Sequence, residues 1–322
     1  MANSYTTLLD IAKANGSDAT TGLIDETINA HPEIKVGSAR TIKGQSYKTL
    51  VRTSLPTTSF RNANQGSATV KSTYENRLVE TFILNPRWVC DKAIADRYED
   101  GPEAYIGMEA NALIAGSMVR LASQFYYGQS SLAAVTGANG LALGDSAGFP
   151  GLMAAYDSTN MVVNAGGTSA GTGSSVWAVK FGPDMVQCVY GENGTLDISP
   201  LWTFPYTDPN DSTKQFTAYI QELLAYPGLQ IGNLRTIGRI YNLTADAGCT
   251  LTDAKLFSLL ALFPVGYRPD AVFMSRRSLN QLRQSRTAVN VTGAPAPIPT
   301  EVEGIPIFPT DAISNVETLN SL

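Results

Sequence analysis

One pattern in the sequence could hold a nucleophile. Residues 144–148 read Gly-Asp-Ser-Ala-Gly, which matches the G-x-S-x-G turn that exposes the catalytic serine of many hydrolases. That chemistry needs a turn from a strand into a helix and a histidine that follows as general base. The sole histidine, His31, lies far upstream, and the glycines and prolines around the pattern leave no helix behind it. The sequence therefore predicts that Ser146 is a loop residue.

Patterns for metal or phosphate binding are also missing. The chain has no C-x-x-C, H-E-x-x-H or calcium-loop motif, and the glycine-rich run 166–173 lacks the G-K-[ST] ending of a phosphate loop. Asp208, Asn210 and Asp211 around Pro209 are typical of a turn. The sequence thus predicts no catalytic residue, cofactor site or metal site. Two carboxylates that meet only on folding leave no pattern, so a carboxylate-based hydrolase acting on polysaccharide stays open as an alternative.

Composition favours a protein whose surface is covered by other subunits. Hydrophobic residues make up 43% of the 322 residues and charged residues only 16%, against about 25% in an average soluble protein. The net charge of −5 and the lack of a basic tail argue against a protein that grips nucleic acid. No apolar run is long enough to span a bilayer, so no membrane partner is predicted. Three scattered cysteines argue against a disulfide framework and fit a reducing cytoplasm.

Charge changes sign along the first quarter of the chain. Residues 1–34 carry one lysine against five acidic residues, a net of −4, whereas residues 35–77 carry eight cations against Glu75, a net of +7. Within the basic stretch, β-like runs at Tyr47–Thr53 and Arg77–Leu84 flank a turn-prone tip at 61–66. Such β arms have too little apolar content for a core of their own. We therefore expect an extended hairpin that lies on another molecule.

The longest predicted helix follows this hairpin. Asp100 can cap its N-terminus, Pro102 suits its first turn, Glu103 complements the positive end of its dipole, and Gly128 can end it. Apolar residues recur at helical spacing over about 102–127. Some 26 residues at ~1.5 Å each give a rod of roughly 39 Å.

The other elements alternate between helix and strand. Short helices are expected at Tyr5–Ala14 and Thr21–Ala30. In the β-rich middle we expect strands at Val176–Phe181, Met185–Tyr190 and Thr236–Leu243, and one helix at Phe216–Ala225. A final α/β alternation comprises helices at Thr252–Phe263 and Ser275–Arg286 and strands at Ala271–Met274 and Gly304–Phe308.

This order of elements resembles the tailed-bacteriophage major capsid proteins of the Hong Kong 97 phage type. The local sequence over most of residues 40–315 is similar to the gp-seven-like branch of that family. The segments that carry the likeness are 175–182 (SVWAVKFG), 228–230 (GLQ), 239–242 (RIYN), 268–276 (RPDAVFMSR) and 304–308 (GIPIF). Each segment is unspecific by itself, and only their order points to the family.

The resemblance implies an α+β fold with four interleaved regions. These are an N-terminal arm (1–34), an extended β-hairpin loop (35–85), a peripheral domain with a long spine helix and a β-rich middle (86–250), and an axial α/β region with a C-terminal return (251–322). It also implies a head protein without an active site, which self-assembles as pentamers and hexamers into an icosahedral shell around double-stranded DNA. Assembly in the host bacterial cytoplasm with separate scaffold, portal and decoration proteins is expected. An encapsulin-like nanocompartment of the same fold is the nearer alternative.

Charge pattern and resemblance together predict where subunits touch. The start of the long helix is acidic, since residues 78–110 carry seven acidic residues against three cations, a net of −4. We expect the basic hairpin of one copy to lie across this acidic start in its neighbour, because carboxylates and arginines form charge-assisted contacts. The predicted contact residues are Lys43, Lys48, Arg52, Arg61, Lys71, Arg77, Asp96, Glu99, Asp100 and Glu103. Some relatives crosslink a hairpin lysine to a neighbour's asparagine; Lys43, Lys48 and Lys71 are candidates, although no partner motif is evident.

Overall fold

The fold centres on a six-stranded mixed sheet. The computed structural model describes residues 6–15, 29–132, 135–137, 142–155, 161–208, 211–289 and 294–319. The strand order is β14-β15-β13-β6-β12-β5. Their bounds are β5 Val162–Asn164, β6 Ser174–Val179, β12 Ile237–Leu243, β13 Ala271–Met274, β14 Glu301–Val302 and β15 Ile305–Pro309. The predicted strands at 176–181, 236–243, 271–274 and 304–308 are confirmed to within two residues at each end.

Helices cover both faces of this sheet. The last turn of α4 (Pro102–Tyr127) packs on one face, where Tyr126 lies 6.3 Å from Trp177 and 6.2 Å from Phe273 between ring centroids. On the opposite face α5 (Asp253–Leu260) approaches so closely that a Cβ at Gly238 would meet the Leu259 side chain at 2.9 Å. Because both faces are covered, every residue of β6, β12 and β13 is buried.

The second sheet lies at the far end of α4 and is antiparallel. In it β10 (Asp211–Leu224) pairs with β4 (Arg87–Asp91) on one side and with β9 (Trp202–Asp208) and β8 (Asp197–Ile198) on the other. The helix predicted at Phe216–Ala225 is therefore wrong. The apolar residues here do recur at helical spacing. The segment is nevertheless a strand, because neighbouring strands pair with every position from Phe216 to Leu224.

A small separate core holds this end together. Ile11 of α1 (Leu8–Ala14), Cys90 of β4, Ala95 of α3 (Lys92–Ala95) and Tyr105 of α4 are buried against one another. Helix α1 confirms the later part of the helix expected at Tyr5–Ala14. The helix predicted at Thr21–Ala30 lies largely outside the described residues, and its last two, Asn29 and Ala30, are not helical.

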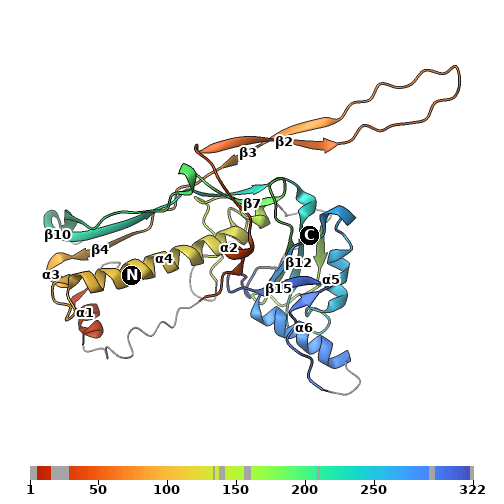
Figure 1. The fold of residues 1–322 in the computed structure, drawn as a ribbon. Helices are drawn as coiled ribbons and strands as arrows, with labels where there is room; N and C mark the ends of the chain where they lie inside the picture. Colours follow the sequence, from red (N-terminus) through yellow and green to blue (C-terminus); the bar gives the residue numbers. More distant parts are fainter. Residues whose placement is uncertain are drawn as a thin grey trace.

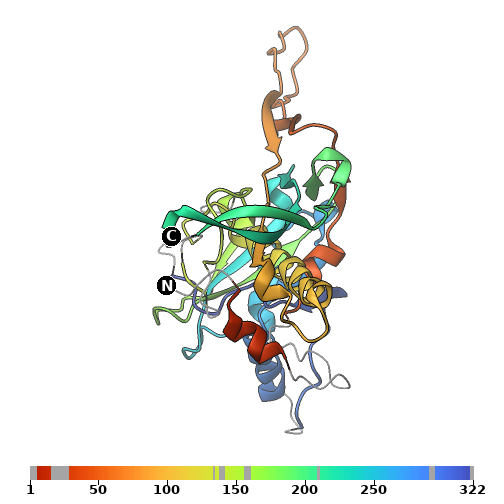
Figure 2. The same ribbon diagram turned by 90° about the vertical axis from the view of Figure 1, so that its left-hand side faces the viewer.

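A two-stranded hairpin projects from the body. Strands β2 (Ser46–Ser54) and β3 (Thr73–Glu80) confirm the expected hairpin, although β3 begins and ends four residues earlier than predicted. Figure 1 shows this hairpin pointing away from α3 and the start of α4, and Figure 2 shows it rising clear of the body. Its base is joined to the body through β1 (Ala39–Thr41), β7 (Val186–Tyr190) and β11 (Pro227–Ile231), which form a three-stranded sheet.

Remaining elements are short, apart from one helix. They are α2 (Pro32–Val36), α6 (Arg276–Val289) and the 3-10 turns at 152–155, 192–194, 234–236 and 265–267. The six-stranded sheet combines strands from before and after residue 250, so residues 86–250 and 251–322 contribute to one sheet. The four-region division stays a prediction.

Candidate subunit-contact surfaces

The hairpin has one face that no other part of the described chain covers. Paired residues of β2 and β3 lie on the same side of the ribbon, so Lys48 and Leu78 share a face with Leu50, Arg52 and Tyr74. Leu50 is 68% exposed, Tyr74 53% and Leu78 52%. The Arg52 guanidinium lies 5.5 Å from the centre of the Tyr74 ring. We call these five residues the outer hairpin face, which is both apolar and cationic.

The opposite face of the hairpin holds it to the body. The Tyr47 hydroxyl donates to Gln230, and Arg77 donates to the Gly232 carbonyl at 3.4 Å. Arg77 is half-buried and also lies 4.0 Å from Glu75, so its main contacts are within the subunit. Lys43, Lys48, Arg52, Arg61 and Lys71 are all exposed, and Arg61 at the tip donates to the Gln65 carbonyl.

The predicted acidic residues gather where α3 meets α4. Asp96, Glu99, Asp100 and Glu103 lie within eight residues of chain and are all exposed. We call these four residues the acidic turn. Helix α1 braces it, since Asn15 donates to the Arg97 carbonyl and accepts from the Glu99 backbone N–H.

The prediction that Asp100 caps α4 is wrong. Gly101 is the N-cap residue, and no side chain bonds to the first turn. Gly101 has φ +89°, which glycine adopts without strain, and its N–H donates to the Tyr98 carbonyl. A glycine next to the aspartate allowed a backbone turn in place of a side-chain cap. Pro102 does occupy the first turn, as predicted.

The two charged groups lie at opposite ends of the molecule. Figure 1 shows the hairpin starting above the middle of the body and pointing away from α3 and the start of α4, so its tip is remote from them. Among the ion pairs of the described residues, none joins a hairpin cation to a carboxylate of the acidic turn. The structure therefore brings the four acidic residues together, whereas the basic residues are spread along the hairpin with Arg77 on its other face. Contact between the two groups requires two copies of the chain.

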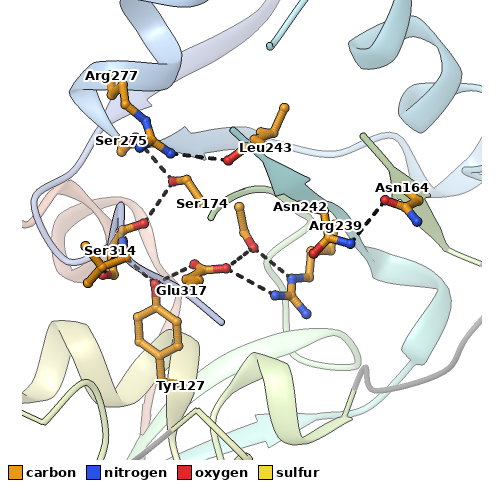
Figure 3. Close-up of polar contacts among 12 residues, drawn as sticks. Tyr127, Asn164, Ser174, Arg239, Asn242, Leu243, Ser275, Arg277, Ser314 and Glu317 are labelled. Carbon is orange, nitrogen blue, oxygen red and sulfur yellow. Dashed lines mark hydrogen bonds and ion pairs between the residues drawn. The ribbon is translucent and has the colours of Figure 1, made fainter. Parts of the chain in front are cut away.

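A buried polar network sits where α4 ends on the six-stranded sheet (Figure 3). The Glu317 carboxylate accepts from the Tyr127 hydroxyl at 2.6 Å, from the Ser175 hydroxyl at 2.6 Å and from the Arg239 guanidinium at 3.3 Å. Arg239 also donates to Ser175 and lies over the rings of Trp177 and Tyr241. Burial raises the pKa of Tyr127 well above its usual range, and the nearby Glu317 charge adds to this. The hydroxyl therefore keeps its proton and serves as a donor.

Comparison with known families decides what kind of protein carries these surfaces. The family model described as Major capsid protein GP7 matches residues 36–320. The chain belongs to this family. The expected Hong Kong 97 phage-type capsid fold and the identification as a phage major capsid protein are thereby confirmed. The family favours the capsid interpretation over both the nanocompartment and the hydrolase.

One solved structure, from bacteriophage epsilon15, shares the fold of this capsid protein. A chain in the near-atomic structure of bacteriophage epsilon15 is 20% identical, with a TM-score of 0.69 over 100% of this chain and 99% of that chain. The capsid of Myoviridae phage XM1 matches at 10% identity and a TM-score of 0.46, over 70% of this chain and 97% of that one. The capsid of a native GTA particle matches at 9% identity and a TM-score of 0.45, over 70% and 94%. No curated protein sequence matches.

A further exposed apolar surface of the capsid protein was missed from the sequence. Pairing of β9 with β10 places Trp202 beside Ile220 and Phe204 beside Ala218, on the face opposite Tyr219. Tyr219 packs toward the small core at α3 and α4. Trp202 and Phe204 are more than half exposed. The alternation of aromatic and small residues from 202 to 206 could have predicted this strand and its exposed face. It was missed because its partner strand, at Phe216–Ala225, was expected to be a helix.

The other patterns that the sequence offers for chemistry lie in a turn and in a loop. Ser146 lies in an exposed turn that Gln124 holds through Asp145 and Phe149. Among the described residues, no three His, Cys, Asp or Glu side chains are placed to hold a metal. Over the same residues, no helix is both long and apolar enough to cross a membrane. The glycine-rich run 166–173 is a loop held by the Asp246 carboxylate.

Proposed function

We propose that the outer hairpin face of one subunit, together with Arg61 and Lys71 nearer the hairpin tip, packs against the acidic turn and the start of α4 in its neighbour. Repeated around rings of five and six copies, this contact builds an icosahedral shell that encloses double-stranded DNA. The observation that supports this proposal is that a cationic and apolar hairpin projects to one side of the molecule. The four exposed carboxylates of the acidic turn lie at the other end of the molecule. Two complementary surfaces at opposite ends make head-to-tail contacts, which close into rings when the rotation permits.

The same proposal covers the partners and the place of assembly. With a net charge of −5 the shell contains DNA without binding it tightly, since tight binding needs many cations on phosphates. Separate scaffold, portal and decoration proteins act with it during assembly in the host cytoplasm. The subunit works through its contacts and has no active site, because Ser146 lies in an exposed turn without a general base in the sequence after it.

Charge reversal tests the proposed contact. Arg52, Arg61 and Lys71 changed together to Glu should lower shell yield at least about tenfold, measured by sedimentation and electron microscopy. Each exposed pair contributes only ~0–1 kcal/mol, so the defect arises because every subunit repeats it. A control with Arg235, Lys214 and Arg276 changed to Glu alters the net charge equally at exposed sites outside the hairpin and should assemble normally.

Rescue tests the named partner. A chain that also carries Asp96→Lys, Glu99→Lys and Glu103→Lys restores opposite charges across the contact and should recover shells, whereas the acidic-turn triple by itself should fail. Recovery would establish pairing between these two groups of residues. If both triples fail and their combination also fails while circular dichroism is normal, the hairpin has a different partner surface.

A further inference from the structure

The segment from Thr310 to Glu317 crosses the ends of the central strands β13 and β6 and is bonded there at Thr310, Ser314, Asn315 and Glu317. Thr310 donates its N–H to the Met274 carbonyl, the Ser314 carbonyl accepts from Ser174, and the Glu317 N–H donates to the Gly173 carbonyl. Asn315 accepts from the Ser275 hydroxyl through its side chain and from Arg277 through its backbone. We call residues 310–317 the strap.

The strap also holds the end of the long helix. Tyr127 is the last residue of α4, and its hydroxyl donates to Glu317 while it accepts the Ser314 N–H at 2.8 Å. Glu317 in turn bonds Ser175 on β6 and Arg239 on β12. One carboxylate therefore ties three elements together: the helix end and two central strands of the sheet (Figure 3).

On this side the middle of α4 is held by a loop and not by the strap, since Arg120 donates to the Ala142 carbonyl at 2.9 Å. A cavity of about 350 Å³ separates it from the strap, lined by Gly116, Arg120 and Ser123 on the helix and by Asp311 and Asn315 on the strap. The orientation of α4 relative to the sheet is therefore set in its last turns, where Gln124 donates to the Asp145 and Phe149 carbonyls and Tyr127 is held by the strap. The helix has 26 residues and is roughly 39 Å long, so a tilt of about 5° there moves its far end by roughly 3 Å.

We infer that the strap is a joint lock: by holding Tyr127 through Glu317, it sets the angle between α4 and the six-stranded sheet, and this angle fixes the size of the shell. The far end of α4 carries the acidic turn, so the angle decides where a neighbour's hairpin is received. The part about shell size rests on the proposed assembly function. The lock itself is a property of one subunit, and it can be measured without assembly.

Two mild substitutions test the lock in the isolated subunit. Tyr127→Phe removes only the hydroxyl, and Glu317→Gln removes only the charge. Spin labels carried by unnatural amino acids at the exposed Glu103 and Gln284 report the distance between the start of α4 and helix α6. We expect both variants to broaden this distance distribution by about 3 Å, from the lever estimate above, with unchanged circular dichroism. Glu301→Gln neutralises an exposed carboxylate elsewhere and should leave the distribution as in wild type.

Particle size tests the consequence. Under conditions where the wild type forms shells of one diameter, Tyr127→Phe and Glu317→Gln should give mixed diameters by cryo-electron microscopy, and Glu301→Gln one diameter. The lock is overturned if both variants show the wild-type distance distribution between the two labels. It is also overturned if a variant only melts at a lower temperature while its label distances stay as in wild type and its shells have one diameter. Should Glu317→Gln fail to fold, Tyr127→Phe decides alone. A wild-type chain that forms no shells under any condition refutes the proposed function but leaves the distance measurement as the test of the lock.

Discussion

The Glu317 carboxylate lies 3.3 Å from the Arg239 guanidinium, and both side chains are withdrawn from water almost completely. Such a pair contributes little net stability over an apolar pair of the same shape, because both charges lose their hydration. Removing one partner is different, since it leaves a buried charge without compensation. The two positions are 78 residues apart in the sequence, so the pair links distant parts of the chain.

The first prediction follows from this asymmetry. Glu317→Leu should lower the free energy of unfolding by about 3–5 kcal/mol, because Arg239 is left buried and unpaired. Combining it with Arg239→Met should recover most of that loss, since no charge then remains. Urea denaturation of the single and double variants measures both. If the double variant loses as much free energy of unfolding as Glu317→Leu and Arg239→Met lose together, the two charges do not interact.

Sequence reasoning succeeded where local signals agreed with the final packing. Pro102 with the following apolar period marked α4, and the short apolar run at 271–274 marked β13. It failed at 216–225, where strands from 87–91 and 202–208 decide the conformation. The Glu317 network left no signal at all, because its members are spread from Tyr127 to Glu317 and meet only through folding. The acidic and basic groups were visible as charge runs, whereas their positions at opposite ends of the molecule were not.

A second prediction concerns alkaline pH. Burial raises the pKa of Cys90 and of Cys188 to about 11, from 9.0. In the unfolded chain these thiols lose their protons at lower pH than in the folded chain. Their contribution to stability is therefore fully present below pH 9 and is lost as pH rises toward 11. Urea midpoints between pH 8 and 10.5 should fall less steeply in Cys90→Ala than in wild type. A Cys249→Ala control tests whether replacing any cysteine has this effect.

A third prediction concerns acid and the glycine-rich loop. Hydrogen bonds from Ser169 and then Thr244 hold the pKa of Asp246 below its ordinary 3.8. The stabilisation of the loop is thus present above pH 3.8 and is lost as pH falls through the lower folded pKa. Asp246→Asn should raise amide exchange at Thr168 and Ser169 already at neutral pH, by about tenfold if one or two bonds weaken. Unchanged exchange would mean that the loop is held by other contacts.

A fourth prediction concerns Ser146. Ser146→Ala should change neither shell yield nor any hydrolytic activity, because its hydroxyl lies in an exposed turn and the chain has no histidine after it. Turnover of a chromogenic ester by wild type and variant, alongside sedimentation, checks both halves. Esterase activity that disappears in the variant would contradict the structural role assigned to the family.

The last prediction separates the apolar residues of the outer hairpin face from the exposed cations of the hairpin. Leu50 and Leu78 are exposed and belong to no core cluster, so Leu50→Ser with Leu78→Ser should leave the free energy of unfolding within about 0.5 kcal/mol of wild type. In the proposed contact these side chains become buried, and losing them should reduce assembly.

Salt distinguishes this apolar contribution to assembly from the contribution of charge. At 0.5 M salt, charge screening should weaken wild-type assembly and narrow its difference from the Arg52/Arg61/Lys71→Glu variant. The leucine variant should keep its deficit relative to wild type, because salt does not screen apolar burial. A matched Thr57→Ser and Thr58→Ser control at exposed hairpin positions should assemble as wild type does. Normal shell yield from the leucine variant at both salt concentrations would leave charge as the only contribution of this face to the contact.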